Sequence, residues 1–324
     1  MKKKKKLHLR TKLLVGAAGV GAAGAALSCG VTQAMSNLAT NRKLPAYGKR
    51  INISGGKEDK SFTARREQAV KALQETPATT VTIQSFDGLE LVGHLVTCPE
   101  PRRLILAFHG WRSNWARDFC MVAPFWQEQH CNVLYVEQRA QGGSQGKYIG
   151  FGLLERKDCL SWLTWADSEN FGLPIYLSGI SMGATTVLMA AGEDLPASVH
   201  GIQADCGFTS PKAIWKHVTE NNLHLTSTPL RQLVTDLSFR RKLHQSLDAY
   251  STITALKSST VPVLFTHGTE DRFVPIQMTY ENYLACAAPR RLVVVPGAAH
   301  AMSYVQEPEA CQKAMLSFWQ EFDK

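Results

Sequence analysis

The stretch "PIYLSGISMGATTVLMAAG", residues 174–192, decides the fold of this chain. An apolar run ends at Gly179, Ser181 follows two residues later, and Gly183 opens an apolar run rich in small residues. Glycine lacks a Cβ, so both glycines leave room where a strand and a helix crowd together. The stretch therefore predicts a strand, a sharp turn with Ser181 at its apex, and a helix. That arrangement exposes a serine as a nucleophile.

A second G-x-S-x-G sequence competes with the first. "GGSQG", residues 142–146, places Ser144 between two glycines. The sequence has no strand directly before Ser144 and no helical period after it, so both flanking elements of a nucleophile turn are missing. Ser144 is predicted to be a turn residue, and Ser181 is the candidate nucleophile.

Short apolar runs alternate with helical stretches on either side of Ser181. Strands that are apolar on both faces and separated by helices indicate a parallel sheet covered on both sides. Asp87-Gly88 adds a hairpin at the start. The sequence predicts an α/β fold with a mostly parallel sheet of eight strands at residues 80–86, 89–96, 103–110, 132–139, 174–179, 200–207, 261–268 and 291–297. Three helical stretches between residues 208 and 258 interrupt the alternation and are predicted to form a lid.

The net charge of +9 is concentrated at one end of the chain. Seven basic residues precede position 13, and the remainder holds 29 basic against 27 acidic residues. The body is therefore close to neutral, which argues against a nucleic-acid partner.

An uncharged segment, residues 13–36, follows the basic residues. This order is typical of a secretory signal or an uncleaved membrane anchor. We expect a single anchor in the cell membrane, with the basic residues in the cytoplasm and the catalytic body outside it. Cleavage with secretion, or lipidation of Cys29 in "ALSC", remains an alternative. The predicted division is an anchor at 1–36, a tether and helix at 37–79, and a catalytic domain at 80–324.

Neither a cofactor nor a metal ion is expected. "GVGAAG", residues 19–24, has the spacing of a dinucleotide-binding loop, but the first acidic residue after it is Glu58. The eight cysteines show no C-x-x-C spacing, so a zinc site is not indicated. One disulfide remains possible if the body lies outside the cell.

A serine nucleophile needs a base that is itself oriented by an acid. In this architecture the chain order is serine, acid, histidine. His300 lies in the loop after the last predicted strand and is the candidate base. Glu270 and Asp271 follow the preceding strand; Asp271 is favoured because its side chain is shorter and "RFVP" follows it. Asp205 is an alternative acid, although its position beside the serine turn favours a structural role.

The negatively charged oxygen of a tetrahedral intermediate needs two backbone donors. The N–H of Met182 is one candidate, because it begins the helix after Ser181. The N–H of Trp111 is the other, in the loop after the first parallel strand. His109 in that loop is expected to shape it without acting as a base.

At this point the residues resemble a known family. "FHGW", "GISMG", "HGTEDRFVP" and "GAAH", in this order, resemble the α/β-hydrolase fold over residues 80–324. "QRAQGGSQGKYIGFGLLERKD" and "ADCGFTS" are similar to bacterial membrane-tethered hydrolases of the serine aminopeptidase-like (S33-type) group. That group has Asp-x-Arg-Gly where this chain has residues 137–140, "EQRA". The resemblance implies a Ser181, Asp271 and His300 triad that hydrolyses an ester, thioester or amide through an acyl-enzyme without a cofactor.

The sequence thus predicts a serine hydrolase of small-molecule esters or peptides. Carboxylesterase activity is favoured over aminopeptidase activity, because no acidic pair that would bind a free amine is identifiable in the lid. A binding protein with a hydrolase-like scaffold is the other alternative, and it would be expected to lack a triad member. Basic lid residues could attract an acidic substrate or form a solvated face: Lys212, Lys216, Arg231, Arg240, Arg241 and Lys242.

Overall fold

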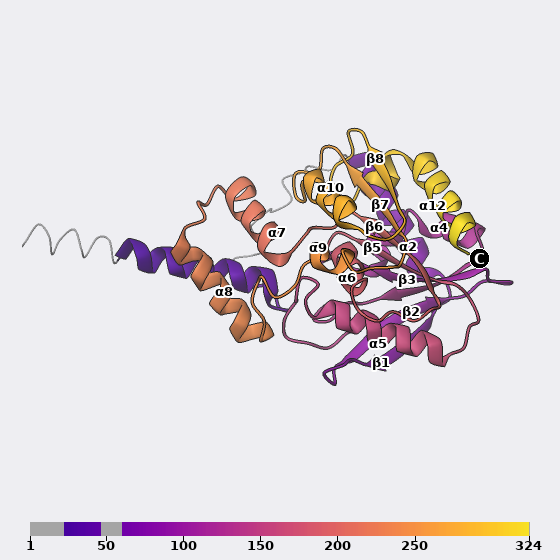
Figure 1. Cartoon of the computed structure of the whole chain (residues 1–324), viewed down its shortest axis with the longest axis horizontal. Helices are drawn as coiled ribbons and strands as arrows, with labels where there is room; N and C mark the ends of the chain where they lie inside the picture. Colours follow the sequence, from indigo (N-terminus) through magenta and orange to yellow (C-terminus); the bar gives the residue numbers. More distant parts are fainter. Residues whose placement is uncertain (1–22, 47–59, 324) are drawn as a thin grey trace, which may run out of the picture.

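The computed structural model describes residues 23–46 and 60–323 of the chain. A single eight-stranded sheet in the order β1-β2-β4-β3-β5-β6-β7-β8 lies at its centre (Figure 1). β2 pairs antiparallel with β1 and β4, and the other five pairings are parallel. The strands are β1(Thr79–Gln84), β2(Glu90–Val96), β3(Arg103–Phe108), β4(Cys131–Val136), β5(Ile175–Ile180), β6(Val199–Asp205), β7(Val263–Gly268) and β8(Arg290–Val295). The predicted mostly parallel sheet of eight strands is confirmed.

Helices cover both faces of the sheet, because its central strands are apolar on both sides. In β3, Leu104 and Leu106 belong to one core, whereas Ile105 and Ala107 belong to the other. The first core packs under α5(Glu155–Ser168), α6(Met182–Ala190), α9(Thr252–Leu256) and α10(Ile276–Ala285). The second packs under α2(Lys60–Glu75), α3(Trp115–Phe119), α4(Ala123–Glu128) and α12(Pro308–Phe322), with α11(Ser303–Gln306) beside α12. Burial of apolar area on both faces is the main force that holds these layers together.

The turn between β5 and α6 is as tight as the sequence predicts. A Cβ added to Gly179 would lie 2.3 Å from the carbonyl carbon of Gly183. A Cβ added to Gly183 would lie 1.8 Å from the carbonyl oxygen of Phe108. Only glycine fits at these positions, so α6 can start directly at the end of β5 and against β3.

The segment between β6 and β7 contains α7(Pro211–His217), the π-helical turn η2(Val218–Asn222), α8(Pro229–Leu243) and then α9. The hydroxyl of Ser210 caps the start of α7, and the hydroxyl of Thr228 caps the start of α8. A proline follows each cap at the first helical position, where its missing N–H costs nothing. These local signals produce the helices in the region where the sequence predicts a lid.

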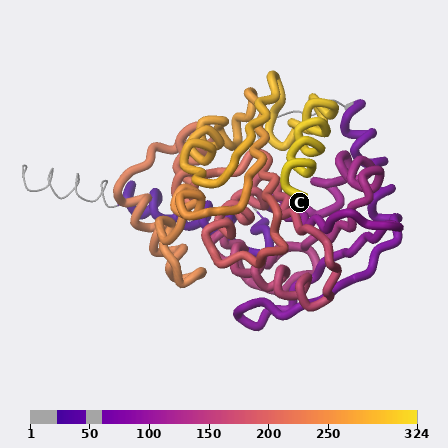
Figure 2. Tube along the Cα trace, turned by 45° about the vertical axis from the view of Figure 1, so that its right-hand side comes forward, coloured from indigo at the N-terminus to yellow at the C-terminus, as the bar shows by residue number. Residues whose placement is uncertain are grey.

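A helix over residues 23–40 lies alongside α8, and both views show the two side by side (Figures 1 and 2). Four side-chain hydrogen bonds join them: Arg231 Nε to Ser28 Oγ at 2.9 Å, Gln33 Nε2 to Ser238 Oγ at 3.1 Å, and Lys242 Nζ to Asn37 Oδ1 at 2.7 Å and to Thr40 Oγ1 at 2.9 Å. Burial lowers the pKa of the Lys242 ammonium to about 8. From Ser28 onward, the N-terminal helix thus packs on α8.

This helix passes through residue 36, the predicted end of the anchor segment, and residues 37–40 continue it. Residues 13–22 of the predicted anchor lie outside the described residues. Within the part that is described, no helix combines the length and the apolarity that a bilayer crossing requires. Each of the eight cysteines lies in the described part, and each is a free thiol.

Candidate active site

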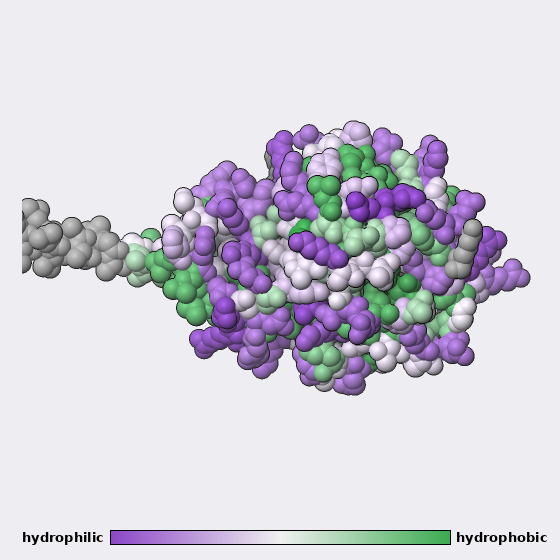
Figure 3. Space-filling model, viewed as in Figure 1, coloured by the Kyte–Doolittle hydropathy of each residue, from purple (hydrophilic) through white to green (hydrophobic). Residues whose placement is uncertain are grey.

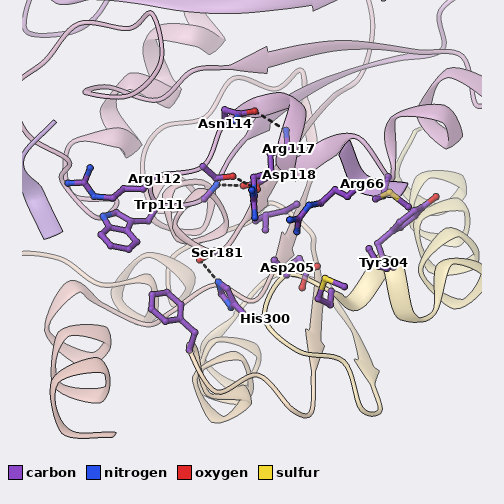
Figure 4. A pocket seen from close by; sticks show the side chains of 18 of the residues that line it. Arg66, Trp111, Arg112, Asn114, Arg117, Asp118, Ser181, Asp205, His300 and Tyr304 are labelled. Atoms are coloured by element: carbon purple, nitrogen blue, oxygen red, sulfur yellow. Dashed lines mark hydrogen bonds between the residues drawn. The ribbon is translucent and has the colours of Figure 1, made fainter. Parts of the chain in front are cut away.

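Ser181 stands at the apex of the turn that ends β5. Its backbone has φ of +56° and ψ of −115°, a combination that L residues rarely adopt. The turn is held because Ser181 N–H donates to the carbonyl of Asp205 at 2.8 Å and its own carbonyl accepts from Thr185 N–H at 3.0 Å. This backbone conformation points the Ser181 side chain away from α6 and into a cavity (Figure 4).

His300 reaches Ser181 from the loop after β8. Its Nε2 lies 2.9 Å from Ser181 Oγ, and its Nδ1 lies 2.7 Å from Asp271 Oδ2. The ring of Phe273 packs edge-on against the imidazole, with 5.0 Å between centroids. The imidazole is thus fixed between a hydroxyl and a carboxylate, with one nitrogen facing each.

Asp271 lies in the turn after β7 and is buried. Its Oδ1 accepts from the backbone N–H groups of Phe273 and Val274, both at 2.9 Å. Burial alone would raise the pKa of the Asp271 carboxyl, but the hydrogen bonds to His267 and His300 outweigh it and hold the pKa well below its usual range. Asp271 is therefore a carboxylate at any ordinary pH. Glu270 is exposed and lies 3.9 Å from Arg272, whereas the carboxylate that contacts the imidazole is that of Asp271.

His267 is a residue of this site that sequence reasoning missed. It is fully buried near the end of β7, and its Nε2 lies 2.9 Å from the carbonyl of Val274 and 3.1 Å from Asp271 Oδ2. Because a carbonyl only accepts, Nε2 carries the proton and donates to both oxygens. Nδ1 then accepts from the Thr279 hydroxyl at 2.6 Å. His267 precedes the candidate acids in the chain and so does not fit the order serine, acid, histidine, but its position four residues before Asp271 is a signal that it could hold this carboxylate.

The two predicted oxyanion donors are the N–H of Met182, which follows Ser181 in the chain, and the N–H of Trp111, which lines the same cavities as Ser181. Met182 is the first residue of α6, so its N–H has no partner within the helix. Trp111 lines the cavity in the loop after β3. On either side of it, Gly110 N–H donates to Asp118 Oδ2 at 2.6 Å and Arg112 N–H donates to Gln141 Oε1 at 2.7 Å. Among the described residues, no protein acceptor meets the N–H of either Met182 or Trp111.

The loop that carries Trp111 is shaped by His109. This histidine is buried, its Nδ1 lies 2.8 Å from the carbonyl of Gly110, and its Nε2 accepts from Gln138 N–H at 3.2 Å. Burial lowers the pKa of the His109 imidazole, which keeps it neutral. His109 therefore organises the loop and has no free nitrogen for proton transfer.

Two cavities meet at Ser181. The larger has a volume of about 590 Å³ and a polar rim that includes Arg66, Arg112, Asn114 and Asp118 (Figure 4). The smaller has a volume of about 60 Å³ and an almost wholly apolar wall. That wall contains Met35, Leu38, Ala39, Trp111, Phe151, Phe208, Ile214, Trp215, Val218, Leu223 and Phe273. The six basic lid residues named from the sequence line neither cavity.

The helix over residues 23–40 contributes directly to these cavities. Leu38 lines both of them. The indole Nε1 of Trp111 donates to the carbonyl of Ala39 at 2.8 Å, and the guanidinium of Arg112 donates to the carbonyls of Leu38 at 2.7 Å and Asn41 at 2.5 Å. These donors satisfy carbonyls that the end of a helix leaves unpaired. The loop that carries the Trp111 N–H and this helix therefore hold each other in place.

Two other polar residues considered from the sequence do not contact the His300 imidazole and bond to other groups. Ser144 is buried in the loop after β4, where its hydroxyl accepts from Val92 N–H at 2.8 Å and donates to the carbonyl of Glu137. Asp205 ends β6, and its Oδ1 accepts from the Ser303 hydroxyl at 3.0 Å. Burial raises the pKa of the Asp205 carboxyl to about 6. The structure thus joins Asp271, and not Asp205, to the His300 imidazole.

Within the described residues, one group of side chains brings three potential metal ligands together: Cys206, Asp271 and His300, with ligand atoms within 4.8 Å of one another. Both oxygens of Asp271 already accept two hydrogen bonds each, and Nδ1 of His300 faces one of them. Burial raises the pKa of the Cys206 thiol well above its usual value, which disfavours the thiolate that binds metals. The donor set fits a hydrogen-bonded triad better than a metal site.

Comparisons with known proteins agree with this fold. A family model described as the prolyl oligopeptidase family matches residues 152–323. The uncharacterized protein YqkD of Bacillus subtilis is 25% identical over 262 residues, which cover 80% of this chain and 85% of YqkD. The esterase Pf2001 of Pyrococcus furiosus superposes with a TM-score of 0.62 at 22% identity, covering 78% of this chain and 95% of the esterase. Est1E of Butyrivibrio proteoclasticus, solved with ferulic acid bound, gives a TM-score of 0.59 at 20% identity over 75% of this chain and 98% of Est1E. The fold is that of the α/β hydrolases, as predicted.

Proposed function

The chain belongs to the prolyl oligopeptidase family and is a serine hydrolase of the α/β-hydrolase fold, and on that premise we propose that Ser181, His300 and Asp271 are its catalytic triad. The observation that carries this proposal is the unbroken chain of contacts from Ser181 Oγ through His300 to Asp271, at 2.9 and 2.7 Å. These distances allow proton transfer between the hydroxyl and the imidazole.

In the proposed mechanism, His300 Nε2 takes the proton from Ser181 Oγ as the oxygen attacks the substrate carbonyl. Asp271 keeps the imidazole oriented and stabilises its positive charge. The N–H groups of Trp111 and Met182 donate to the oxygen that becomes negative. His300 then returns the proton to the leaving group, and water hydrolyses the acyl-enzyme by the same steps in reverse order.

We propose that the substrate is a carboxylic ester with an apolar acyl group. The small cavity beside Ser181 has an almost wholly apolar wall, which suits a hydrocarbon chain. The larger cavity has a polar rim that suits the leaving group. Membership in a peptidase family favours peptide hydrolysis as the alternative. Against an aminopeptidase, the described lid residues that line these cavities include no acidic side chain that would bind a free amine.

We further propose that the predicted anchor segment attaches the enzyme to the cell membrane through its part before Ser28, with the catalytic body outside the cytoplasm, because residues from Ser28 onward contact the folded body. The basis is the sequence order, in which seven basic residues precede an uncharged segment.

The test is a comparison of kcat/KM for p-nitrophenyl esters of graded length and for aminoacyl anilides. We expect the esters to be the better substrates. His300→Ala and Asp271→Ala should each lower kcat/KM by at least about 10³-fold, as losses of triad members do elsewhere. Glu270→Ala is the matched control, and it should retain activity because its carboxylate is exposed.

Two results would revise the proposal. A preference for anilides would replace the esterase with a peptidase. Activity that survives Asp271→Ala but not Glu270→Ala would move the acid by one residue.

A further inference from the structure

Helix α8 of the lid exposes a row of leucines. Leu230, Leu233 and Leu237 have 39%, 55% and 55% of their surface exposed. Their spacing of three and four residues puts them on one side of the helix. The opposite side packs inward, where Phe239 and Leu243 are buried. An outward row of leucines on a soluble domain marks a surface that meets something apolar.

The neighbouring helix extends this surface. Residues 23–27, "AGAAL", are all exposed and carry no charge. Leu27 is 71% exposed and Val31 is 37% exposed. This first part of the helix therefore presents no polar side chain to water. Figure 3 shows apolar surface at this end of the molecule, where α8 and the N-terminal helix lie. We call Leu27, Val31, Leu230, Leu233 and Leu237 the leucine face.

The charge next to the leucine face is positive. Helix α8 holds four basic residues and one acidic residue, and three of the basic ones are in its last turn. Lys242 is turned toward Asn37, and Arg240 pairs with Asp236 at 2.6 Å, whereas Arg241 is exposed. Basic residues beside an apolar face are attracted to anionic lipid headgroups.

The chain that precedes residue 23 is suited to the same partner. Residues 1–22 lie outside the described residues, and in sequence they consist of a basic stretch followed by the uncharged residues 13–22. They join the domain at its uncharged helical end, beside Leu27. A bilayer that binds residues 13–22 would therefore also be close to the leucine face.

We propose that the leucine face lies on the surface of an anionic lipid bilayer, so that the folded domain itself contacts the membrane through its lid. This goes beyond the proposed function, which attaches the chain only through its N-terminal segment. The same helix carries Leu27 and Val31 on this face and brings Met35 and Leu38 to the cavities beside Ser181. The lipid contact and the cavities are thus joined by one helix.

The test uses the full chain reconstituted into vesicles of phosphatidylcholine and phosphatidylglycerol. Cys29 and Cys98, the two thiols that are not buried, are first changed to alanine. An environment-sensitive NBD probe is then attached at Leu237→Cys, or at Leu316→Cys as the matched control. Leu316 is 41% exposed on α12, at the end of the molecule away from the N-terminal helix (Figure 1).

An apolar helix face on a membrane enters about 5–10 Å into the headgroup region. We therefore expect a blue shift of the probe at position 237 and its quenching by a phospholipid with a nitroxide high on its acyl chain. The probe at 316 should show neither. Vesicles of phosphatidylcholine alone should give weaker quenching at 237.

Equal, water-like emission from both probes would overturn the proposal. A blue shift at 237 without nitroxide quenching would also overturn it, because a second copy of the chain would then cover the leucine face. Each labelled variant is also assayed on a short, water-soluble ester. Retained hydrolysis with no quenching refutes the lipid contact alone and leaves the proposed hydrolase intact.

Discussion

At the scale of single residues, the carboxyl groups of Asp205 and Asp271 lie in contrasting environments. Asp205 ends β6 and Asp271 lies in the turn after β7, but Asp271 accepts four hydrogen bonds and Asp205 accepts one at its side chain, from Ser303. Hydrogen bonds offset the cost of burial at Asp271 and lower its pKa. Burial prevails at Asp205 and raises the pKa of its carboxyl to about 6. The Asp271 carboxyl therefore stays charged, whereas the Asp205 carboxyl keeps its proton at weakly acidic pH.

The raised pKa of Asp205 makes a stability prediction. An unfolded aspartate loses its proton near pH 4, so between about pH 4 and pH 6 the folded chain binds more protons than the unfolded chain. The stabilisation that comes from proton binding at Asp205 is fully present below pH 4 and is lost as the pH rises through 6. Asp205→Asn stays neutral and avoids the loss. The unfolding free energy of Asp205→Asn, taken relative to that of the unmodified protein, should therefore rise by up to about 3 kcal/mol between pH 4 and pH 8.

Urea unfolding of both proteins at pH 4 and pH 8 measures this change. If the difference in unfolding free energy between the two proteins were the same at both pH values, Asp205 would not titrate with a raised pKa.

At the scale of elements, the turn from β5 to α6 was predictable because its requirements are local. Positions 179 and 183 require glycine because a Cβ there would collide with the backbone of the same turn or of β3. A strand and a helix flank both glycines in the sequence. The chain order serine, acid, histidine then indicated His300 as the base and the loop that holds Asp271 as the source of the acid. His267 was not predictable in the same way, because its contact with Asp271 depends on how the turn after β7 folds back. The φ of +60° at Ala140, a conformation that favours glycine, was likewise not predictable from the residues next to it.

The same turn gives an expectation for Gly183→Ala. The added Cβ would lie 1.8 Å from the backbone oxygen of Phe108, which belongs to a central strand and has little room to move. Overpacking of this kind costs about 1–3 kcal/mol or more. We expect a lower melting temperature or loss of soluble protein. Gly30→Ala is the matched control, because Gly30 is exposed with nothing within 4 Å of an added Cβ. A Gly183→Ala protein that melts like the control would show that α6 does not press on β3.

At the scale of the whole molecule, the N-terminal helix and the active site depend on each other. The composition of residues 13–36 indicated an anchor, and composition says nothing of contacts made 200 residues away. In the fold, Gln33 and Asn37 bond to α8, and Trp111 and Arg112 bond to the end of the same helix. Local sequence patterns do not encode such pairings, so the part that this helix plays in the cavity walls emerged only from the structure.

Two truncations test this dependence. A chain that starts at residue 45 loses Leu38 from both cavities and the carbonyls that hold Trp111 and Arg112. Small displacements of positioning groups cost on the order of 10- to 100-fold in rate, and we expect a loss of this size in kcat/KM for a soluble ester. A chain that starts at residue 23 keeps the helix and should retain its activity. Equal activity of the two truncated proteins would show that the helix is not part of the site.

The central claim is that Ser181 is the nucleophile, and covalent capture tests it most directly. The folded protein is treated with a fluorophosphonate, and the modified peptide is located by mass spectrometry. The account predicts one adduct, on Ser181, and its absence from Ser181→Ala and from protein unfolded before treatment. An adduct on Ser144, or no adduct on the folded protein, would contradict it.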